Sequence, residues 1–263
     1  MRDITYPAII VTAKLAFKAL DIKFRIVGDE HVPTNGPAIL AVNHISYVDF
    51  IFGGFATQRS KRLVRFMAKR ELFDHRWTGP LMRSLHHIEV DRDEGTKAYQ
   101  PALDYLAAGE IVGVFPEATI SRSFELKEFK SGPVRLAMAS GVPIIPLILW
   151  GTQRMYTKDH SRDFSRGKTV SLTVGEPFHV TESNAVAETK RLRARMSTLL
   201  DETIRNYPDH QERAWWVPER YGGTAPTPEK AQRLDAEEKR RRAQARRAKR
   251  QHKTSDTSPD SSD

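Results

Sequence analysis

A histidine and an aspartate five residues apart are the residues of this chain whose types and spacing most directly suggest chemistry. His44 and Asp49 belong to the segment Asn-His-Ile-Ser-Tyr-Val-Asp, and Ser46 between them is placed to cap a following helix. A carboxylate beside an imidazole can fix its tautomer and stabilise its protonated form, as in a general base. The pair is half of a catalytic triad with no obvious nucleophile. A capped turn has the same spacing, so the pair alone leaves both interpretations open.

Two apolar runs are expected to position these polar residues. Residues 37–42 have the length and β-branched content of a buried strand, so His44 should lie at its end, where α/β sheets place their chemistry. Residues 111–115 form a second such run, which leads directly into a carboxylate, two hydroxyls and several cations. These are Glu117, Thr119, Ser121, Arg122, Lys127 and Lys130. The second segment therefore predicts the cationic, hydroxyl-rich edge of a pocket.

The order of the remaining elements predicts an α/β fold with a mostly parallel central sheet flanked by helices. The periodicity predicts strands at 22–27, 63–68, 86–92 and 170–174, and helices at 77–85, 96–108, 132–140 and 186–205. An amphipathic helix at 6–22 could dock on its own domain or lie on lipid, and docking is the favoured alternative.

The most apolar run of the chain, residues 142–150, contains two prolines. Because proline donates no hydrogen bond to a ladder, Pro143 and Pro146 predict an edge or irregular strand beside a groove. The neighbouring residues His86 and His87 would point to opposite faces of a strand, so they are not expected to hold a metal ion.

Composition excludes several classes of chemistry and divides the chain in two. The 263 residues include no cysteine, which excludes disulfides, thiolate catalysis and cysteine-ligated zinc. The formal net charge of +9 favours anionic partners. Residues 1–220 form the expected catalytic domain, and 221–263 a basic, flexible tail. Within the tail, residues 229–253 hold eleven Lys or Arg against four Asp or Glu, which indicates a basic helix or a disordered arm.

Residues 229–253 could bind nucleic acid, but they contain no interleaved aromatic residues that could stack on bases, and anionic lipid serves the same charge equally well, so nucleic acid is not the expected partner. No segment reaches the roughly 20 apolar residues of a spanning helix, and the first residues do not resemble a secretion signal. We therefore expect neither export nor a membrane span.

Taken together, four segments of the chain resemble the glycerophospholipid acyltransferase family, of the type that acylates 1-acylglycerol 3-phosphate. Asn43 to Asp49 matches its His-x4-Asp motif, and Val90-Asp91-Arg92 matches the end of its second block. Residues 115–121, Phe-Pro-Glu-Ala-Thr-Ile-Ser, correspond to the third block, and residues 142–146, Val-Pro-Ile-Ile-Pro, to the fourth. Their order and separations match over roughly residues 20 to 180.

The resemblance implies that His44 acts as general base on the free hydroxyl of the acceptor, oriented by Asp49, and that the hydroxyl attacks an acyl thioester directly. It implies acyl-CoA or acyl-carrier protein as co-substrate, a lysophospholipid acceptor and no cofactor. The predicted substrate-binding residues are Asn43, Ser46, Arg92, Glu117, Ala118, Thr119, Ser121, Arg122 and Lys130. The acyl groove is expected at Val142, Pro143, Ile144 and Pro146. The expected location is cytoplasmic, on the inner, anionic face of the cell membrane.

The third block departs from the family pattern at two positions. Ala118 and Ile120 stand where the family usually has glycine and arginine, so one phosphate-binding guanidinium is absent. Arg122 or Lys130 could replace it. The acceptor could therefore be another lysophospholipid or a glycolipid, and a non-catalytic protein that binds anionic lipid or nucleic acid is the remaining alternative.

Overall fold

The computed structural model describes residues 5–90, 99–209 and 211–255. A seven-stranded sheet has the order β1-β7-β6-β2-β5-β3-β4, and all neighbouring strands are parallel except β6 and β7. The strands are β1 (Lys23–Val27), β2 (Ala38–Val42), β3 (Val64–Lys69), β4 (Ile88–Val90), β5 (Ile111–Val114), β6 (Ile144–Trp150) and β7 (Thr169–Val174). The predicted α/β class with a mostly parallel sheet is confirmed.

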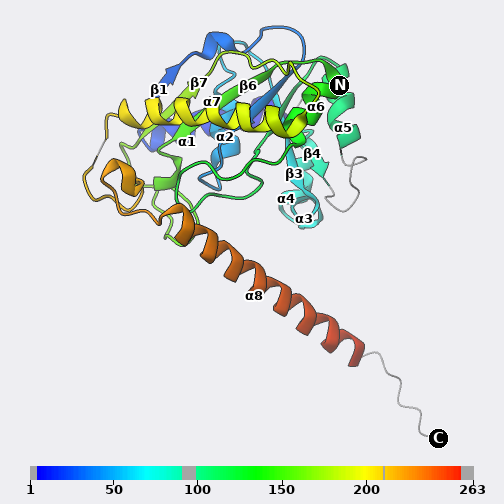
Figure 1. Cartoon of the computed structure of the whole chain (residues 1–263), viewed down its shortest axis with the longest axis vertical. Coiled ribbons are helices and arrows are strands. Elements are labelled where there is room, and N and C mark those ends of the chain that lie inside the picture. Colours follow the sequence, from blue (N-terminus) through cyan, green and yellow to red (C-terminus); the bar gives the residue numbers. More distant parts are fainter. Residues whose placement is uncertain (1–4, 91–98, 210, 256–263) are drawn as a thin grey trace, which may run out of the picture.

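Helices cover both faces of this sheet (Figure 1). They are α1 (Thr5–Ala19), α2 (Asp49–Phe55), α3 (Arg70–Asp74), α4 (Thr78–Ser84), α5 (Gln100–Ala107), α6 (Gly132–Ser140), α7 (Ala185–Arg205) and α8 (Pro228–Ser255). Short 3₁₀ turns occur at Asp29–His31, Thr152–Arg154 and Glu219–Tyr221. Among the described residues, no helix combines the length and apolar content needed to cross a bilayer.

Strand residues alternate between two hydrophobic cores, as the pleat of a doubly covered sheet requires. In β2, Ile39 and Ala41 join the core beneath α5, α6 and α7, whereas Leu40 and Val42 join the core beneath α1 and α2. Both cores are closed by helices, so β2 is buried at every position.

Helix α1 docks on its own domain, as favoured from the sequence. Tyr6 and Phe17 are its buried residues, and the Phe17 ring stacks on Phe52 of α2 with centroids 4.9 Å apart. The opposite side of α1 leaves Val11 and Leu15 more than half exposed. One face of the helix is therefore fixed by aromatic packing, and the other faces solvent.

The prediction that the proline-containing run forms an edge strand is wrong, because β6 lies between β7 and β2 and is buried throughout. Pro143 precedes the strand, where its carbonyl accepts from the Ile39 N–H at 3.0 Å. Pro146 lies just beyond the end of β7, and its carbonyl accepts from the Gly175 N–H at 2.8 Å. Both prolines use their carbonyls at ladder ends, so neither removes a rung from the sheet interior.

Other predicted elements need smaller corrections. Strand β4 begins at Ile88, because His86 adopts a positive φ of 51° in the preceding turn. Helix α5 is described from Gln100 onward, and the expected start at Thr96 lies outside the described residues. Of the two forms expected for the basic tail, a helix is found, and α8 extends away from the domain (Figure 1).

Candidate active site

Two neighbouring strands end together and deliver the predicted site residues to one edge of the sheet. Strands β2 and β5 are parallel, with Ala41 opposite Val114 in register. The chain leaving β2 therefore carries His44 beside the chain leaving β5, and the rings of His44 and Phe115 stack with centroids 4.3 Å apart. The Ser121 N–H donates to the His44 carbonyl at 2.7 Å and joins the two loops a second time.

The Asp49 carboxylate is fully buried and accepts four hydrogen bonds. Its Oδ2 accepts from His44 Nδ1 at 3.0 Å and from the backbone N–H groups of Ile45 and Ser46, each at 2.7 Å. Its Oδ1 accepts from the Thr152 hydroxyl at 2.7 Å. Donors this numerous stabilise a carboxylate that has lost its water. Asp49 is the first residue of α2, where the helix dipole also favours a negative charge.

This contact determines which nitrogen of His44 can act as a base. Because a carboxylate only accepts hydrogen bonds, the proton of neutral His44 lies on Nδ1, and Nε2 carries the free lone pair. The His44 side chain is 21% exposed, whereas Asp49 is 0% exposed. The imidazole is thus oriented from within the protein and open to a substrate on one side.

Glu117 braces the backbone of the site from the β5 side. Its Oε1 accepts from the His44 N–H at 2.9 Å, and its Oε2 accepts from the Lys127 N–H at 3.0 Å. Burial raises the pKa of Glu117 to about 7, against the two backbone hydrogen bonds and the charge of Lys127, which lower it. Both oxygens face the main chain and the side chain is buried. Its expected role as a substrate ligand is therefore corrected to one in positioning the loop.

Asn43 and Ser46 are also structural, contrary to the prediction that they bind substrate. The Asn43 amide donates to the Leu149 carbonyl at 3.0 Å and accepts from the Leu149 N–H at 2.7 Å, so it extends the pairing of β2 with β6. The Ser46 hydroxyl donates to the Tyr156 carbonyl at 2.6 Å. Ser46 is not the N-cap of α2, since Val48 holds that position. Both side chains are 0% exposed.

The remaining residues of the β5 loop have separate roles. Ala118 is half-buried and adopts a left-handed φ of 61°. Thr119 is half-buried and its hydroxyl accepts from Lys127 Nζ at 2.7 Å. The Ser121 hydroxyl is buried and donates to the Glu125 carbonyl at 2.7 Å, so Ser121 is not placed to bind substrate. Ile120 is 3% exposed and belongs to the interior.

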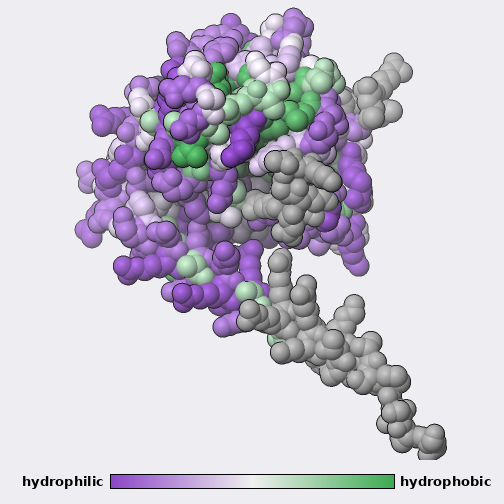
Figure 2. All heavy atoms as spheres, turned by 45° about the vertical axis from the view of Figure 1, so that its right-hand side comes forward, coloured by the Kyte–Doolittle hydropathy of each residue, from purple (hydrophilic) through white to green (hydrophobic). Residues whose placement is uncertain are grey.

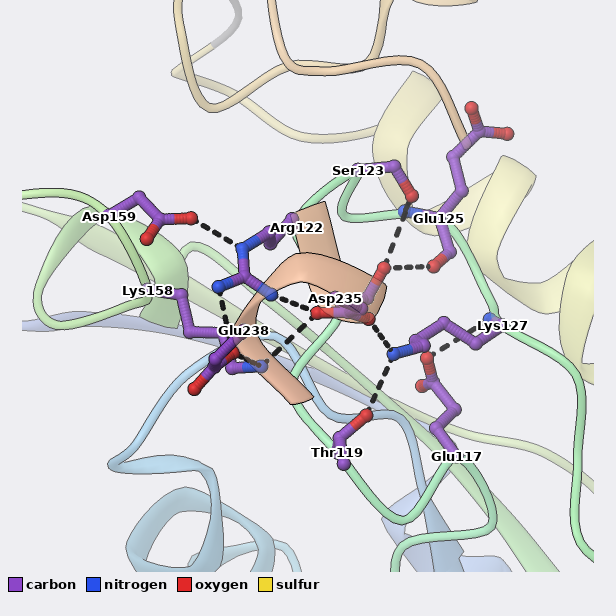
Figure 3. A network of polar contacts seen from close by, with 11 residues as sticks. Glu117, Thr119, Arg122, Ser123, Glu125, Lys127, Lys158, Asp159, Asp235 and Glu238 are labelled. Atoms are coloured by element: carbon purple, nitrogen blue, oxygen red, sulfur yellow. Dashed lines mark hydrogen bonds and ion pairs between the residues drawn. The ribbon is translucent and has the colours of Figure 1, made fainter. Parts of the chain in front are cut away.

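The predicted cations have different surroundings. Arg122 is buried, and its guanidinium pairs with Asp159 and with two carboxylates of α8. Lys130 is exposed, and its backbone N–H donates to the Pro116 carbonyl at 2.9 Å. Arg92 lies outside the described residues. Of the two cations that the structure describes, Arg122 belongs to a network of polar contacts that includes Thr119 and Lys127 of the same loop (Figure 3).

The expected acyl groove at the start of β6 is not formed by the residues assigned to it. Ile144 is fully buried in the core, and Pro146 is buried within the sheet. Val142 and Pro143 lie where β6 begins, and Ile144 pairs with Ile39 at the start of β2. His44 follows the end of β2, so these two residues lie at the opposite end of the parallel strands from His44. Tight packing of a central strand leaves no space there for an acyl chain.

Several residues of the site carry no local sequence signal. Thr152 donates its hydroxyl to Asp49, and Lys158 adds its ammonium group to the ion pairs around Arg122. Both residues follow β6 by a few positions. Only the folded sheet places them near His44, more than a hundred residues earlier. Within the described ranges, no three His, Asp or Glu side chains are grouped to hold a metal ion. His87 is buried, and its Nδ1 accepts from the Phe66 N–H at 3.1 Å.

Comparisons with known proteins relate this chain to acyltransferases. The family model described as Acyltransferase matches residues 23–150, from β1 to the end of β6. The 1-acyl-sn-glycerol-3-phosphate acyltransferase of Bacillus subtilis is 29% identical over 182 residues, which cover 69% of this chain and 86% of that protein. The enzyme of the same name from Limnanthes douglasii is 35% identical over 141 residues, which cover 52% of this chain and only 48% of that protein.

A solved structure supports the fold. The crystal structure of the 1-acyl-sn-glycerophosphate acyltransferase of Thermotoga maritima superposes with a TM-score of 0.64 at 24% sequence identity, over 80% of this chain and 86% of that one. The match of the family model over residues 23–150 and the curated relatives both relate this chain to acyltransferases, and the solved structure shows that it shares their fold.

Proposed function

We propose that the chain transfers a fatty acyl group from acyl-CoA or acyl-carrier protein to the free hydroxyl of 1-acyl-sn-glycerol 3-phosphate and so forms phosphatidic acid. The similarity to relatives that are 1-acyl-sn-glycerol-3-phosphate acyltransferases by name supports this reaction. The observation that carries the proposal is the His44–Asp49 pair, in which a buried carboxylate orients a partly exposed imidazole at the carboxyl edge of the sheet.

In the proposed step, His44 Nε2 accepts the proton of the acceptor hydroxyl while the hydroxyl oxygen attacks the thioester carbonyl carbon. The new C–O ester bond forms, the C–S bond breaks, and the departing thiolate takes up the proton from the imidazolium. Asp49 stays ionised and stabilises the imidazolium through Nδ1–H. The substrate supplies the nucleophile, so the step needs no covalent acyl-enzyme.

The test replaces the base while preserving the shape of the site. Thioester release from acyl-CoA is measured with 1-acylglycerol 3-phosphate as acceptor, for wild type, His44→Gln and the control His179→Gln, whose side chain is exposed. General-base catalysis contributes about 10²- to 10⁴-fold, so His44→Gln should lower kcat by at least about a hundredfold. The control should keep wild-type activity. A fully active His44→Gln variant would remove His44 as the base.

A second acceptor class has one specific observation in its favour. Ile120 is enclosed in the protein, so the position at which the family usually has arginine supplies no cation. A different lysophospholipid or a glycolipid has a headgroup that needs fewer cations than the phosphate monoester of 1-acylglycerol 3-phosphate. A panel of acceptors, each offered with acyl-CoA and with acyl-carrier protein, separates the alternatives. Preference for a neutral acceptor would reject 1-acylglycerol 3-phosphate as the substrate.

We further propose peripheral binding to an anionic membrane surface. Val11, Lys14, Leu15 and Lys18 are exposed on one stripe of α1, which combines apolar side chains with cations, as interfacial helices do. The described part of α8 beyond the domain is mainly hydrophilic (Figure 2). Replacing Val11 and Leu15 together by serine should reduce sedimentation with anionic vesicles, whereas the same change at exposed Val27 should not. Equal loss in both variants would contradict the assignment to α1.

A further inference from the structure

Three cations from the loops that follow β5 and β6 form a cluster, which carboxylates of α8 occupy (Figure 3). The Arg122 guanidinium, with a side chain only 5% exposed, pairs with Asp159 of the domain and with Asp235 and Glu238 of α8. The distance from Arg122 to Glu238 is 2.9 Å. A guanidinium this deeply enclosed normally binds a planar or tetrahedral oxyanion with several oxygens.

Two lysines complete the cluster. Lys158 Nζ lies 3.3 Å from Asp235 and 3.1 Å from Glu238. Lys127 Nζ pairs with Asp235 and also donates to the Thr119 hydroxyl at 2.7 Å. We call Arg122, Lys127, Lys158 and Thr119 the cation pocket. Each α8 carboxylate therefore contacts at least two cations of the cation pocket.

The charges show what the cation pocket is suited to bind. Among the described residues, the three cations form an ion pair with one carboxylate of the domain, Asp159, so two positive charges are left for other partners. Asp235 and Glu238 supply two negative charges. A phosphate monoester carries nearly the same charge near neutral pH and offers several acceptor oxygens at one point. The α8 carboxylates therefore have the charge of a phosphate group.

Covalent and hydrogen-bond links connect the cation pocket to His44. Glu117 accepts from the backbone N–H groups of both His44 and Lys127. On the other side, the Thr157 hydroxyl donates to the Ile45 carbonyl at 2.7 Å, and Thr157 directly precedes Lys158. The cation pocket is thus built on two segments that are hydrogen-bonded to the backbone of His44 and Ile45.

The contact between α8 and the domain is apolar near the start of the helix, where Ala231 is buried and Leu234 half-buried, and polar beyond it. From Ala236 to Ala245, every residue of α8 is exposed except Glu238, which is half-buried. Burial alone would raise the pKa of Glu238, but hydrogen bonds from Arg122 and Lys158 outweigh it and lower the pKa to about 2. Beyond Leu234 the helix is therefore held by its ion pairs, which a competing anion or added salt can replace.

We propose that Asp235 and Glu238 occupy the phosphate subsite of the acceptor, so that α8 is an internal competitor which a phosphate-bearing substrate must displace. The inference rests on the proposed function for its catalytic consequence. When α8 occupies the cation pocket in some of the molecules, only the remaining molecules can bind the acceptor. The apparent Kd for the acceptor is then the intrinsic Kd divided by the fraction of molecules whose cation pocket is free. Release of α8 then regulates the binding of substrate, not the chemistry at His44.

The test neutralises the two carboxylates in the full-length chain. Asp235→Asn with Glu238→Gln is compared with a matched control, Glu229→Gln with Glu237→Gln, which removes the same charge from exposed positions of α8. The first pair should lower KM for 1-acylglycerol 3-phosphate by about fivefold or more, with kcat and the KM for acyl-CoA unchanged. An unchanged or raised KM, or an equal fall in the control, would overturn the proposal.

A binding experiment separates failure of this inference from failure of the proposed function. Calorimetry with glycerol 3-phosphate and with inorganic phosphate needs no turnover. The variant Asp235→Asn with Glu238→Gln is compared with wild type. If the variant binds only glycerol 3-phosphate more tightly, the cation pocket is a headgroup site, and if it binds both ligands more tightly, the pocket is a general phosphate site. If it binds neither more tightly, the internal competitor is rejected, even if the chain is an active acyltransferase. If the variant binds these ligands more tightly but neither protein transfers an acyl group, the cation pocket is supported as a phosphate site and the proposed reaction is rejected.

A third measurement leaves the ion pairs intact, in case the neutralised variant does not fold. Because the chain has no cysteine, Ala236→Cys on the exposed side of α8 gives a single site for a spin label. Saturating glycerol 3-phosphate should increase the mobility of the label, and equal ionic strength of sodium chloride should do so less. A label spectrum that glycerol 3-phosphate leaves unchanged would refute displacement of α8.

Discussion

The buried carboxylate of Glu117 should make the stability of the protein depend on pH in a direction that can be calculated. Burial raises its pKa from 4.5 to about 7. Between these values the folded protein holds the proton while the unfolded chain has released it, so stability falls as the pH rises through this window. With about 1.4 kcal/mol per pKa unit, the loss between about pH 5 and about pH 8 is roughly 2.5 kcal/mol.

Glu117→Gln removes this titration and adds a cost that does not depend on pH. An amide has one acceptor oxygen, so one of the two backbone N–H groups, from His44 or Lys127, would face an NH₂ group. Such a lost hydrogen bond costs about 1–3 kcal/mol. The variant should therefore be the less stable protein at about pH 5 and should approach wild type by about pH 8.

Urea unfolding of both proteins across this range measures the effect. The difference in the free energy of unfolding should change by roughly 2.5 kcal/mol in favour of Glu117→Gln as the pH rises. Exposed Glu128→Gln serves as the control and should follow wild type at every pH. Parallel curves for wild type and Glu117→Gln would refute a burial-driven rise in the pKa of Glu117.

Three further substitutions test the geometry around His44. Asp49→Asn should lower kcat of acyl transfer by about 30- to 1000-fold, because a carboxylate 3.0 Å from the imidazolium stabilises it by about 2–4 kcal/mol at a partly buried site. A kcat near that of wild type would exclude this stabilising role of Asp49. Gly113→Ala should destabilise by about 2–3 kcal/mol in urea unfolding, since its Cβ would lie 2.5 Å from Phe66. Ala118→Gly should stabilise by about 0.5–1 kcal/mol in the same assay, because left-handed strain outweighs the entropy of glycine, and a loss of stability would contradict this.

The sequence was sufficient for features that depend on local pattern. Continuous apolar runs indicated the buried strands, and the polar residues that follow two of them indicated the edge at which His44 and Glu117 meet. The spacing of His44 and Asp49 also predicted their contact, since both belong to one turn. These predictions succeed because neighbouring residues in the chain determine them.

Features that depend on distant partners could not be predicted from the sequence. The position of Pro146 within the sheet was predicted wrongly, because a central strand tolerates a proline there only if the neighbouring strand β7 ends beside it. Where β7 ends is not encoded in the residues around Pro146. Asn43 was taken for a substrate ligand because its backbone partner, Leu149, lies more than a hundred residues away. The ion pairs of Arg122 with α8 span a similar separation, and the basic composition of the tail conceals the two acidic residues that make them.

The side chain of Asn43 has a consequence for cooperativity. Its amide substitutes for a peptide group and so continues the ladder between β2 and β6 to the residue directly before His44. The turn that carries His44 therefore begins inside the unit that unfolds as a whole, not in a segment that can open by itself. The position of His44 is thus as persistent as the sheet itself, and any mobility that the proposed reaction needs must come from the parts that surround it.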